Sequence, residues 1–124
     1  MKKDDGIYLR HILECIRRIE EDVAEGREHF MARHTPQDAV LRNLQVLAES
    51  TQRLSEELKD SQPTVEWQKI SAFRNILVHD YLGIDLEAVW RITQVEIPSL
   101  KLAIESMLAL LSCWEQEPGI PPAP

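Results

Sequence analysis

One stretch of the sequence combines the repeat of a helix with a run of polar side chains: Trp67-Gln68-Lys69-Ile70-Ser71-Ala72-Phe73-Arg74-Asn75-Ile76-Leu77-Val78-His79-Asp80-Tyr81. Its apolar residues recur every three or four positions, as they do on the buried face of a helix. Pro63 ends whatever precedes the stretch, and Thr64 can cap the helix that follows. Gly83 breaks the pattern on the other side. The stretch therefore predicts a helix, the third of the chain.

Two helices are expected before this stretch. The first covers about Asp5 to Glu25, with Asp4 or Asp5 as its cap and Gly26 just past its end. Its apolar face is spaced by steps of three and four: Ile12, Ile16, Ile19 and Val23. The second begins at Thr35-Pro36-Gln37-Asp38, a start signal with a hydroxyl cap, a proline at the first helical position and an acid in the first turn. Helical spacing predicts that it continues to near Asp60: Val40, Leu44, Leu47, Leu54 and Leu58.

The chain after Gly83 is expected to form a short helix and then a longer one. Asp85 starts the short helix, which runs through Trp90 and Ile92. Pro98 either kinks the following segment or opens the last helix, Leu100 to Leu111. No segment alternates as a strand does, so the predicted fold is an all-α bundle of about four to five helices. Residues 1–114 form one domain, and residues 115–124, with four of the seven prolines, form a disordered tail.

Length and composition limit the class of protein. The 124 residues suffice for one domain, and 44% hydrophobic against 28% charged residues is a globular balance. No apolar run reaches the roughly 18 residues that span a bilayer, and the polar start lacks the pattern of a secretory signal. We therefore expect a cytoplasmic protein with no membrane partner. Cys15 and Cys113, far apart in amphipathic segments, are expected to be reduced packing residues.

The net charge of −7 opposes broad binding to a polyanion, so any nucleic-acid site must be local. Arginines do gather in two groups, for which a solvated helix face is the ordinary explanation: Arg10, Arg17 and Arg18, and then Arg42, Arg53 and Arg74.

Helical geometry indicates how the polar residues of the third helix are arranged. At 100° per residue, Asn75 and His79 share a face, while Arg74 and Tyr81 fall within about 20° of each other if the helix continues that far. Arg74 and His79 are about 140° apart, so a site containing both needs a second helix or a second chain. Two antiparallel copies of this helix meeting across a two-fold axis would bring both faces into one cleft.

Such a cleft suits metal-free cleavage of an RNA phosphodiester. A histidine takes the proton from a 2′-hydroxyl or gives one to the leaving oxygen, and an arginine stabilises the charge that grows on the phosphate. Asn75 could orient the phosphate or the base. The requirement for a 2′-hydroxyl nucleophile would make the enzyme specific for RNA.

The same spacing also fits a purely structural role, a capped helix end with a satisfied histidine, and Asp80 beside His79 serves either interpretation. His11, His29 and His34 lack partners at metal-ligand spacing, so we expect no metal site and no cofactor. The sequence has no Gly-rich phosphate loop and no paired aspartates of the nucleotidyltransferase kind.

These residues resemble the signature of the HepT-like proteins of the HEPN class. The central part of the resemblance is the segment 74–85, from Arg74 to Asp85. Further matching stretches cover most of the chain up to about residue 111: Gln37-Asp38-Ala39-Val40-Leu41-Arg42-Asn43-Leu44, Arg53-Leu54-Ser55, Trp67, Val89-Trp90 and Ile97-Pro98-Ser99-Leu100.

The resemblance implies a HEPN-type helical bundle that is active as a homodimer, with Arg74 and His79 of both subunits lining a shared cleft. It also implies metal-independent endoribonuclease activity, as the toxin of a type VII-like toxin-antitoxin pair. The antitoxin would be a minimal nucleotidyltransferase that transfers AMP to Tyr81, forming O-AMP-tyrosine. Asp80 stands where a glutamate is common in the family, which keeps the charge.

Two other functions remain open at this stage. The chain could be a non-catalytic helical adaptor that binds and positions a nucleotidyltransferase, with the same polar residues at the interface. It could also be a plain helical dimer module in which Arg74 and His79 satisfy each other across the interface.

Overall fold

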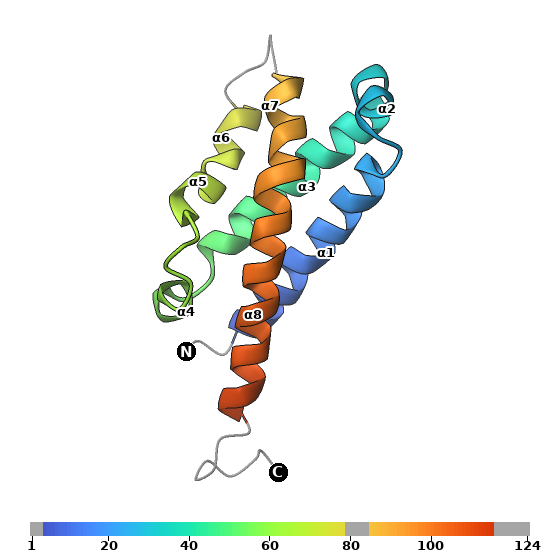
Figure 1. Ribbon diagram of the computed structural model, residues 1–124. Helices are drawn as coiled ribbons and strands as arrows, with labels where there is room; N and C mark the ends of the chain where they lie inside the picture. The colour runs from blue at the N-terminus through green and yellow to red at the C-terminus, as the bar shows by residue number, and fades with distance from the viewer. Residues whose placement is uncertain (1–3, 79–84, 116–124) are drawn as a thin grey trace.

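The computed structural model describes residues 4–78 and 85–115, and all regular structure in these ranges is helical. The helices fall into four bodies, namely α1, α3, the pair α5–α6, and a continuous run from α7 to α8, with α2 and α4 as short connections (Figure 1). Their bounds are α1 Asp5–Val23, α2 Arg27–Ala32, α3 His34–Gln52, α4 Glu56–Asp60, α5 Trp67–Ser71, α6 Phe73–Val78, α7 Leu86–Arg91, the π-helix η1 Ile92–Glu96 and α8 Ile97–Glu115. The predicted all-α bundle is confirmed.

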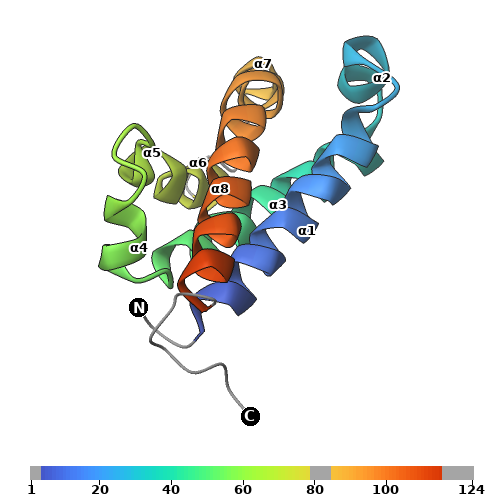
Figure 2. The same cartoon turned by 60° about the horizontal axis from the view of Figure 1, so that its bottom comes forward.

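Helices α1 and α3 lie side by side, the run from α7 to α8 packs against α1, and α5 and α6 pack against α3 (Figures 1 and 2). Gly26, with a φ of 97°, makes the turn between α1 and α2, a conformation that favours glycine. The apolar stripes predicted from the sequence form the core between these bodies, and the buried members include Leu9, Ile12, Ile16, Ile19, Val40, Leu44, Leu47, Leu100 and Ile104. The spacing of three and four positions thus identified the faces that pack.

The predicted second helix is too long, because α3 ends at Gln52 and a separate α4 begins at Glu56. Leu54 and Leu58 are nevertheless buried, as their spacing suggested. The chain turns at Ser55, whose hydroxyl oxygen accepts a hydrogen bond from the Leu58 N–H at 3.2 Å. A serine followed by two glutamates is itself a start signal for a helix, and here it overrides the continuing apolar repeat. The start of α3 is also two residues earlier than predicted, at His34 rather than at Pro36.

A buried carboxylate fixes this turn to the other end of the chain. Asp5 is only 1% exposed, and its two oxygens accept hydrogen bonds from the Ser55 N–H at 2.9 Å and the Ser55 hydroxyl at 2.7 Å. Asp4 holds the N-cap position of α1 without a side-chain capping bond, so Asp5 joins helices instead of capping one. The orientation of α4 therefore depends on a residue fifty positions away.

We expect Asp5→Ala to lower the free energy of unfolding by about 1–3 kcal/mol, because it leaves buried donors of Ser55 without an acceptor. Urea unfolding followed by circular dichroism measures this loss. Asp4→Ala is the matched control, since Asp4 is exposed and makes no side-chain capping bond. Equal losses for the two variants would contradict a structural role for the Asp5–Ser55 contact.

The predicted third helix is divided at Ala72 into α5 and α6. The Asn75 N–H donates to the Ala72 carbonyl at 2.9 Å, three residues back instead of four, so the backbone is tighter at this point. Ile70 and Phe73 stay buried on both sides of the break. Glu66, and not Thr64, holds the N-cap position, and the Trp67 Nε1 donates to the Lys59 carbonyl at 3.1 Å, which joins α5 to the end of α4.

The last body of the bundle begins where the sequence predicts. The Asp85 side chain accepts from the Ala88 N–H at 3.1 Å and caps α7. Pro98 lies in the first turn of α8, directly after η1, so the prediction that it opens the last helix is confirmed, although α8 extends beyond the predicted bounds at both ends. Proline lacks an N–H donor, and the wider π-helical turn before it accommodates the altered hydrogen bonding.

Three further predictions concern single segments. Both cysteines are free, and Cys15 is buried as predicted, whereas Cys113 is exposed and the predicted packing role is wrong for it. All but the first residue of the predicted tail 115–124 lies outside the described residues. None of the helices in the described ranges combines the length and apolar character needed to cross a membrane.

Candidate active site

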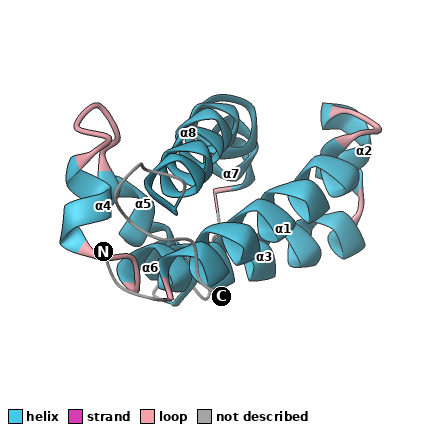
Figure 3. Cartoon of the chain, turned by 90° about the horizontal axis from the view of Figure 1, so that it is seen from below, coloured by secondary structure: helices cyan, strands magenta, loops and turns pink. Residues whose placement is uncertain are grey.

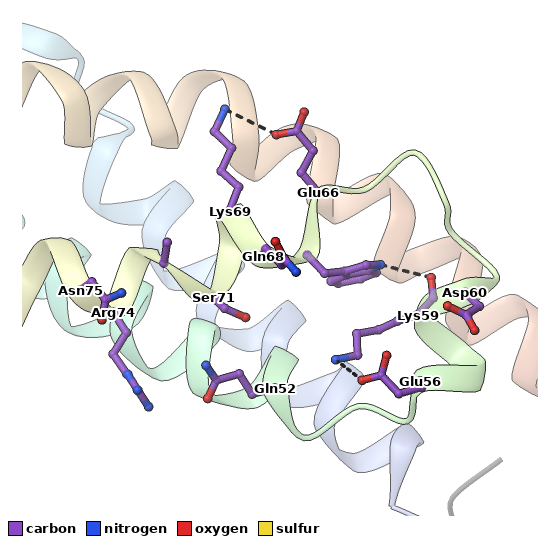
Figure 4. Close-up of a pocket in the computed structure, with 12 residues that line it drawn as sticks. Gln52, Glu56, Lys59, Asp60, Glu66, Gln68, Lys69, Ser71, Arg74 and Asn75 are labelled. Atoms are coloured by element: carbon purple, nitrogen blue, oxygen red, sulfur yellow. Dashed lines mark hydrogen bonds and ion pairs between the residues drawn. The ribbon is translucent and has the colours of Figure 1, made fainter.

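Arg74 and Asn75 are exposed on α6 and line an open groove of about 850 Å³ (Figure 4). The groove lies among the end of α3, α4, α5 and α6. Figure 3 shows these helices from below the bundle. Helix α5 contributes its floor, and Gln52 at the end of α3 and Glu56 of α4 form the opposite side. The structure thus brings two of the predicted site residues to one concave surface.

The lysines of this groove are neutralised by acids. Lys59 Nζ lies 3.2 Å from Glu56 Oε1, and Lys69 Nζ lies 2.8 Å from Glu96 Oε1 and 4.0 Å from Glu66 Oε2. The hydrogen bond to Glu96 is the main reason why the pKa of Lys69 is raised above its ordinary value. Neither ammonium group therefore offers a free positive charge to a ligand.

Arg74 differs from these lysines. In residues 4–78 and 85–115 it has neither an ion pair nor a hydrogen bond through its side chain. Its guanidinium group keeps five N–H donors in a planar fork that matches the oxygens of a phosphate. Arg74 is therefore the cation of the groove that is available to an anion.

Several other arginines have structural partners, as a solvated helix face predicts. Arg17 and Arg18 bond to Glu14, and their hydrogen bonds lower the pKa of that carboxyl to about 2. Arg27 pairs with Glu87. Surface pairs of this kind contribute little to stability, and they leave these arginines partly neutralised.

His79, Asp80 and Tyr81 lie outside the described residues, in the segment 79–84 between α6 and the Asp85 cap of α7. The angular relations of Arg74 to His79 and Tyr81 therefore stay predictions. Helix α6, which carries Arg74, ends at Val78, the residue before His79 in the sequence.

Two of the other histidines lie beside acidic side chains four positions away. His29 Nε2 lies 2.8 Å from Glu25 Oε2, and His34 Nδ1 lies 3.7 Å from Asp38 Oδ2. Within the described part of the chain, no three His, Cys, Asp or Glu side chains gather in an arrangement that could hold a metal ion.

Sequence reasoning missed Gln52, Glu56 and Ser71 as residues that line the groove. Gln52 and Glu56 were hidden because the second helix was predicted to continue through residues 53–55, which places both in mid-helix. The start signal at Ser55 was the feature that could have revealed the turn and the concave surface beside it.

A family model described as ribonuclease HepT-like matches residues 12–107. The chain belongs to the HepT-like ribonuclease family. This membership confirms the resemblance carried by residues 74–85 and assigns the HepT-like chain to a class of RNA-cleaving enzymes. The matched range includes both Arg74 and the residues on α3 to α5 that line the groove.

Curated relatives agree with this assignment. A probable ribonuclease HepT of Thermococcus cleftensis is 32% identical over 86% of the HepT-like chain and 98% of its own length. A candidate RNase of Methanocaldococcus jannaschii is 30% identical over 84% of the chain and 96% of its own length. A third relative, also from M. jannaschii, is named a gamma-glutamylcyclotransferase and candidate RNase, and is 36% identical over 82% of the chain. The HepT-like chain spans only 46% of that longer protein. No solved structure gives a significant match.

Proposed function

We propose that this chain is a metal-independent endoribonuclease and the toxin of a type VII-like toxin-antitoxin pair, with Arg74 and His79 as its catalytic residues. The observation that carries the proposal is Arg74, which has no ion pair among the described residues and lies in a groove whose lysines are paired with acids, one residue before Asn75 and five before His79. Family membership supports RNA cleavage as the type of reaction.

In the proposed reaction His79 removes the proton from a 2′-hydroxyl, whose oxygen attacks the adjacent phosphorus and expels the 5′-oxygen of the next nucleotide. The products are a 2′,3′-cyclic phosphate and a free 5′-hydroxyl, whose proton comes from an acid, either a protonated His79 of the second chain or water. Arg74 stabilises the extra negative charge on the pentacoordinate phosphorus. Asn75 supports this role by orienting the phosphate or base, and Asp80 orients the histidine.

The proposed active form is a homodimer. With about 140° between Arg74 and His79 around one helix, a single chain cannot turn both side chains toward one phosphate if the helix continues past Val78. The exposure of Arg74 and Asn75 leaves them accessible to a second copy of the chain. A two-fold axis beside α6 would then place Arg74 of one subunit near His79 of the other.

The proposed partner is a minimal nucleotidyltransferase that inactivates the toxin by transferring AMP to Tyr81. Arg74 and Tyr81 are seven positions apart, which is close to two turns of helix. AMP on Tyr81 would place a phosphate beside Arg74, where it would occupy the position of the RNA phosphate.

A cleavage assay with Arg74→Ala tests the proposed site. Because Arg74 stabilises charge only as the reaction proceeds, we expect its loss to lower the cleavage rate by about 10²–10³. Purified proteins are compared on labelled RNA in the presence of EDTA. Arg42→Ala is the matched control, since Arg42 is an exposed arginine of α3 that lines none of the groove.

Equal rates for the Arg74 and Arg42 variants would exclude the proposed role of Arg74. An unmodified wild-type protein that binds a nucleotidyltransferase but cleaves no RNA would favour the alternative, a non-catalytic adaptor. Loss of dimerisation in His79→Gln, without any change in RNA, would favour the plain dimer module.

A further inference from the structure

A second hollow adjoins the groove of Arg74. It has a volume of about 360 Å³ and is lined by Tyr8 of α1 and by Arg53, which follows α3, together with Asp4 and residues 54 and 55. Gln52 and Glu56 line both this hollow and the groove, so the two spaces meet at these side chains. A ligand bound at Arg74 can therefore extend past Gln52 toward Arg53 without leaving a concave surface.

Arg53 and Tyr8 form the distinctive part of the second hollow. The Arg53 guanidinium carbon lies over the Tyr8 ring, 6.0 Å from its centroid. Tyr8 is half-buried and packs against the hydrophobic core, so the ring is a fixed support for the cation. A cation–π contact holds a guanidinium group without neutralising it or using its N–H donors.

The partners of Arg53 distinguish it from the arginines of the helix faces. Glu14 and Glu87 take up the charge of Arg17, Arg18 and Arg27, whereas within the described residues Arg53 has the Tyr8 ring and no carboxylate. Of the cations that line the two joined hollows, Arg53 and Arg74 are those without an ion pair in the described ranges. Two free guanidinium groups along one path suit a ligand with spaced negative charges.

Acidic side chains along the two joined hollows limit how much negative charge a ligand can carry there. Asp4 is exposed at the rim of the second hollow, and Glu56 is partly compensated by Lys59. A long polyanion such as a duplex would meet these carboxylates, but one nucleotide would not need to. The volume of the hollow is at the lower end of the range for small-ligand sites, roughly 300 Å³ upward.

We propose that the hollow of Tyr8 and Arg53 is a second subsite for single-stranded RNA, which binds a nucleotide of the same strand beyond the two that are joined by the phosphate at Arg74. Arg53 contacts the phosphate of this nucleotide, and its base stacks on the guanidinium plane that Tyr8 supports. Aromatic and arginine planes are the groups on which proteins stack unpaired bases. The inference rests on the proposed function for its choice of ligand, and it adds the residues that extend the site beyond the scissile phosphate.

Binding of 2′-O-methyl RNA tests this subsite, because such oligonucleotides lack the nucleophile and cannot be cleaved. The full chain is titrated by fluorescence anisotropy against oligonucleotides of increasing length, from a dinucleotide upward. We expect Arg53→Ala to lower the affinity for the longer oligonucleotides by at least about tenfold and to leave the dinucleotide nearly unaffected. The slope of log affinity against log salt should fall by about 0.7, the value for one phosphate contact on a single strand.

Two matched variants separate binding from folding. Arg42→Ala removes an exposed arginine of α3 outside both hollows and should change neither the affinity nor its dependence on length. Tyr8→Leu keeps apolar packing against the core but removes the ring, and it should reproduce part of the loss seen with Arg53→Ala. A thermal unfolding curve confirms that each variant is folded.

The result that overturns the inference is an Arg53→Ala protein that loses no more affinity than Arg42→Ala at every length. This outcome is independent of the proposed function, because the binding test uses RNA that cannot be cleaved. The proposed function is tested separately, by cleavage of unmodified RNA. A protein that binds long oligonucleotides through Arg53 but cleaves no RNA would contradict the proposed function and leave the subsite standing. If the wild-type protein cleaves RNA and the Arg53 variant binds the oligonucleotides as tightly as the wild type, the subsite is contradicted and the proposed function stands.

Discussion

His79→Ala is expected to lower the rate of RNA cleavage by about 10²–10⁴ while leaving the helical bundle folded, because it removes the proposed proton-transfer group of the site. Purified wild-type and variant proteins are compared on the same RNA, with circular dichroism as the check on folding. The matched control is His11→Ala, which removes an exposed histidine of α1 that lines neither hollow. Cleavage at the wild-type rate by the His79 variant would end the proposal that this residue is catalytic.

The same variant shows whether the site is shared between two chains. If Arg74 of one subunit acts with His79 of the other, a dimer of one Arg74→Ala chain and one His79→Ala chain contains one intact site. Refolding an equal mixture of the two inactive proteins should then restore about a quarter of the wild-type activity, since half of the dimers are mixed and each has one working site. A site formed within a single chain predicts no recovery.

Tyr81→Phe is expected to abolish neutralisation by a nucleotidyltransferase, which would change growth from full rescue to arrest. The variant lacks the hydroxyl oxygen that would attack the α-phosphorus of ATP, so AMP cannot be attached there and pyrophosphate is not released. Growth is measured after co-expression of toxin and partner, and mass spectrometry of the wild-type protein tests for one added AMP. Tyr8→Phe is the matched control, because it removes the hydroxyl of the other tyrosine in the chain.

The Tyr81 variant must itself arrest growth when expressed alone, since otherwise the loss of rescue would have no meaning. If the partner still neutralises Tyr81→Phe, inhibition proceeds through complex formation or through another residue. Rescue by a catalytically inactive nucleotidyltransferase would lead to the same conclusion.

The apolar repeats determined most of the fold. Ile12, Ile16 and Ile19 of α1 and Val40, Leu44 and Leu47 of α3 are all buried, as a period of 3.6 residues requires of a helix that covers a core. The caps at Asp85 and the turn at Gly26 were also visible, because each depends on one residue and its immediate neighbours. Such local signals are read from the chain without knowledge of its partners.

The break at residues 53–55 depends on a tertiary contact in addition to the local cap at Ser55. Leu54 within this break and Leu58 after it keep the helical spacing and are buried, so the repeat alone gives no sign of the break. The turn at Ser55 is stabilised by Asp5, fifty residues earlier, and the start of α5 by the hydrogen bond from Trp67 to the Lys59 carbonyl. Contacts over such separations exist only once the helices have packed.

For the candidate site too, one part was determined by the sequence and another part only by the tertiary structure. The sequence by itself determined the family and the residue types, since the stretch from Arg74 to Tyr81 contains the arginine, histidine and tyrosine that the chemistry needs. Only the tertiary structure decided which cations are available, because Lys69 meets Glu96 of another helix, while among the described residues Arg74 and Arg53 meet no carboxylate. A sequence gives the number of charges, but pairing depends on distances of a few ångströms that are set when the helices pack.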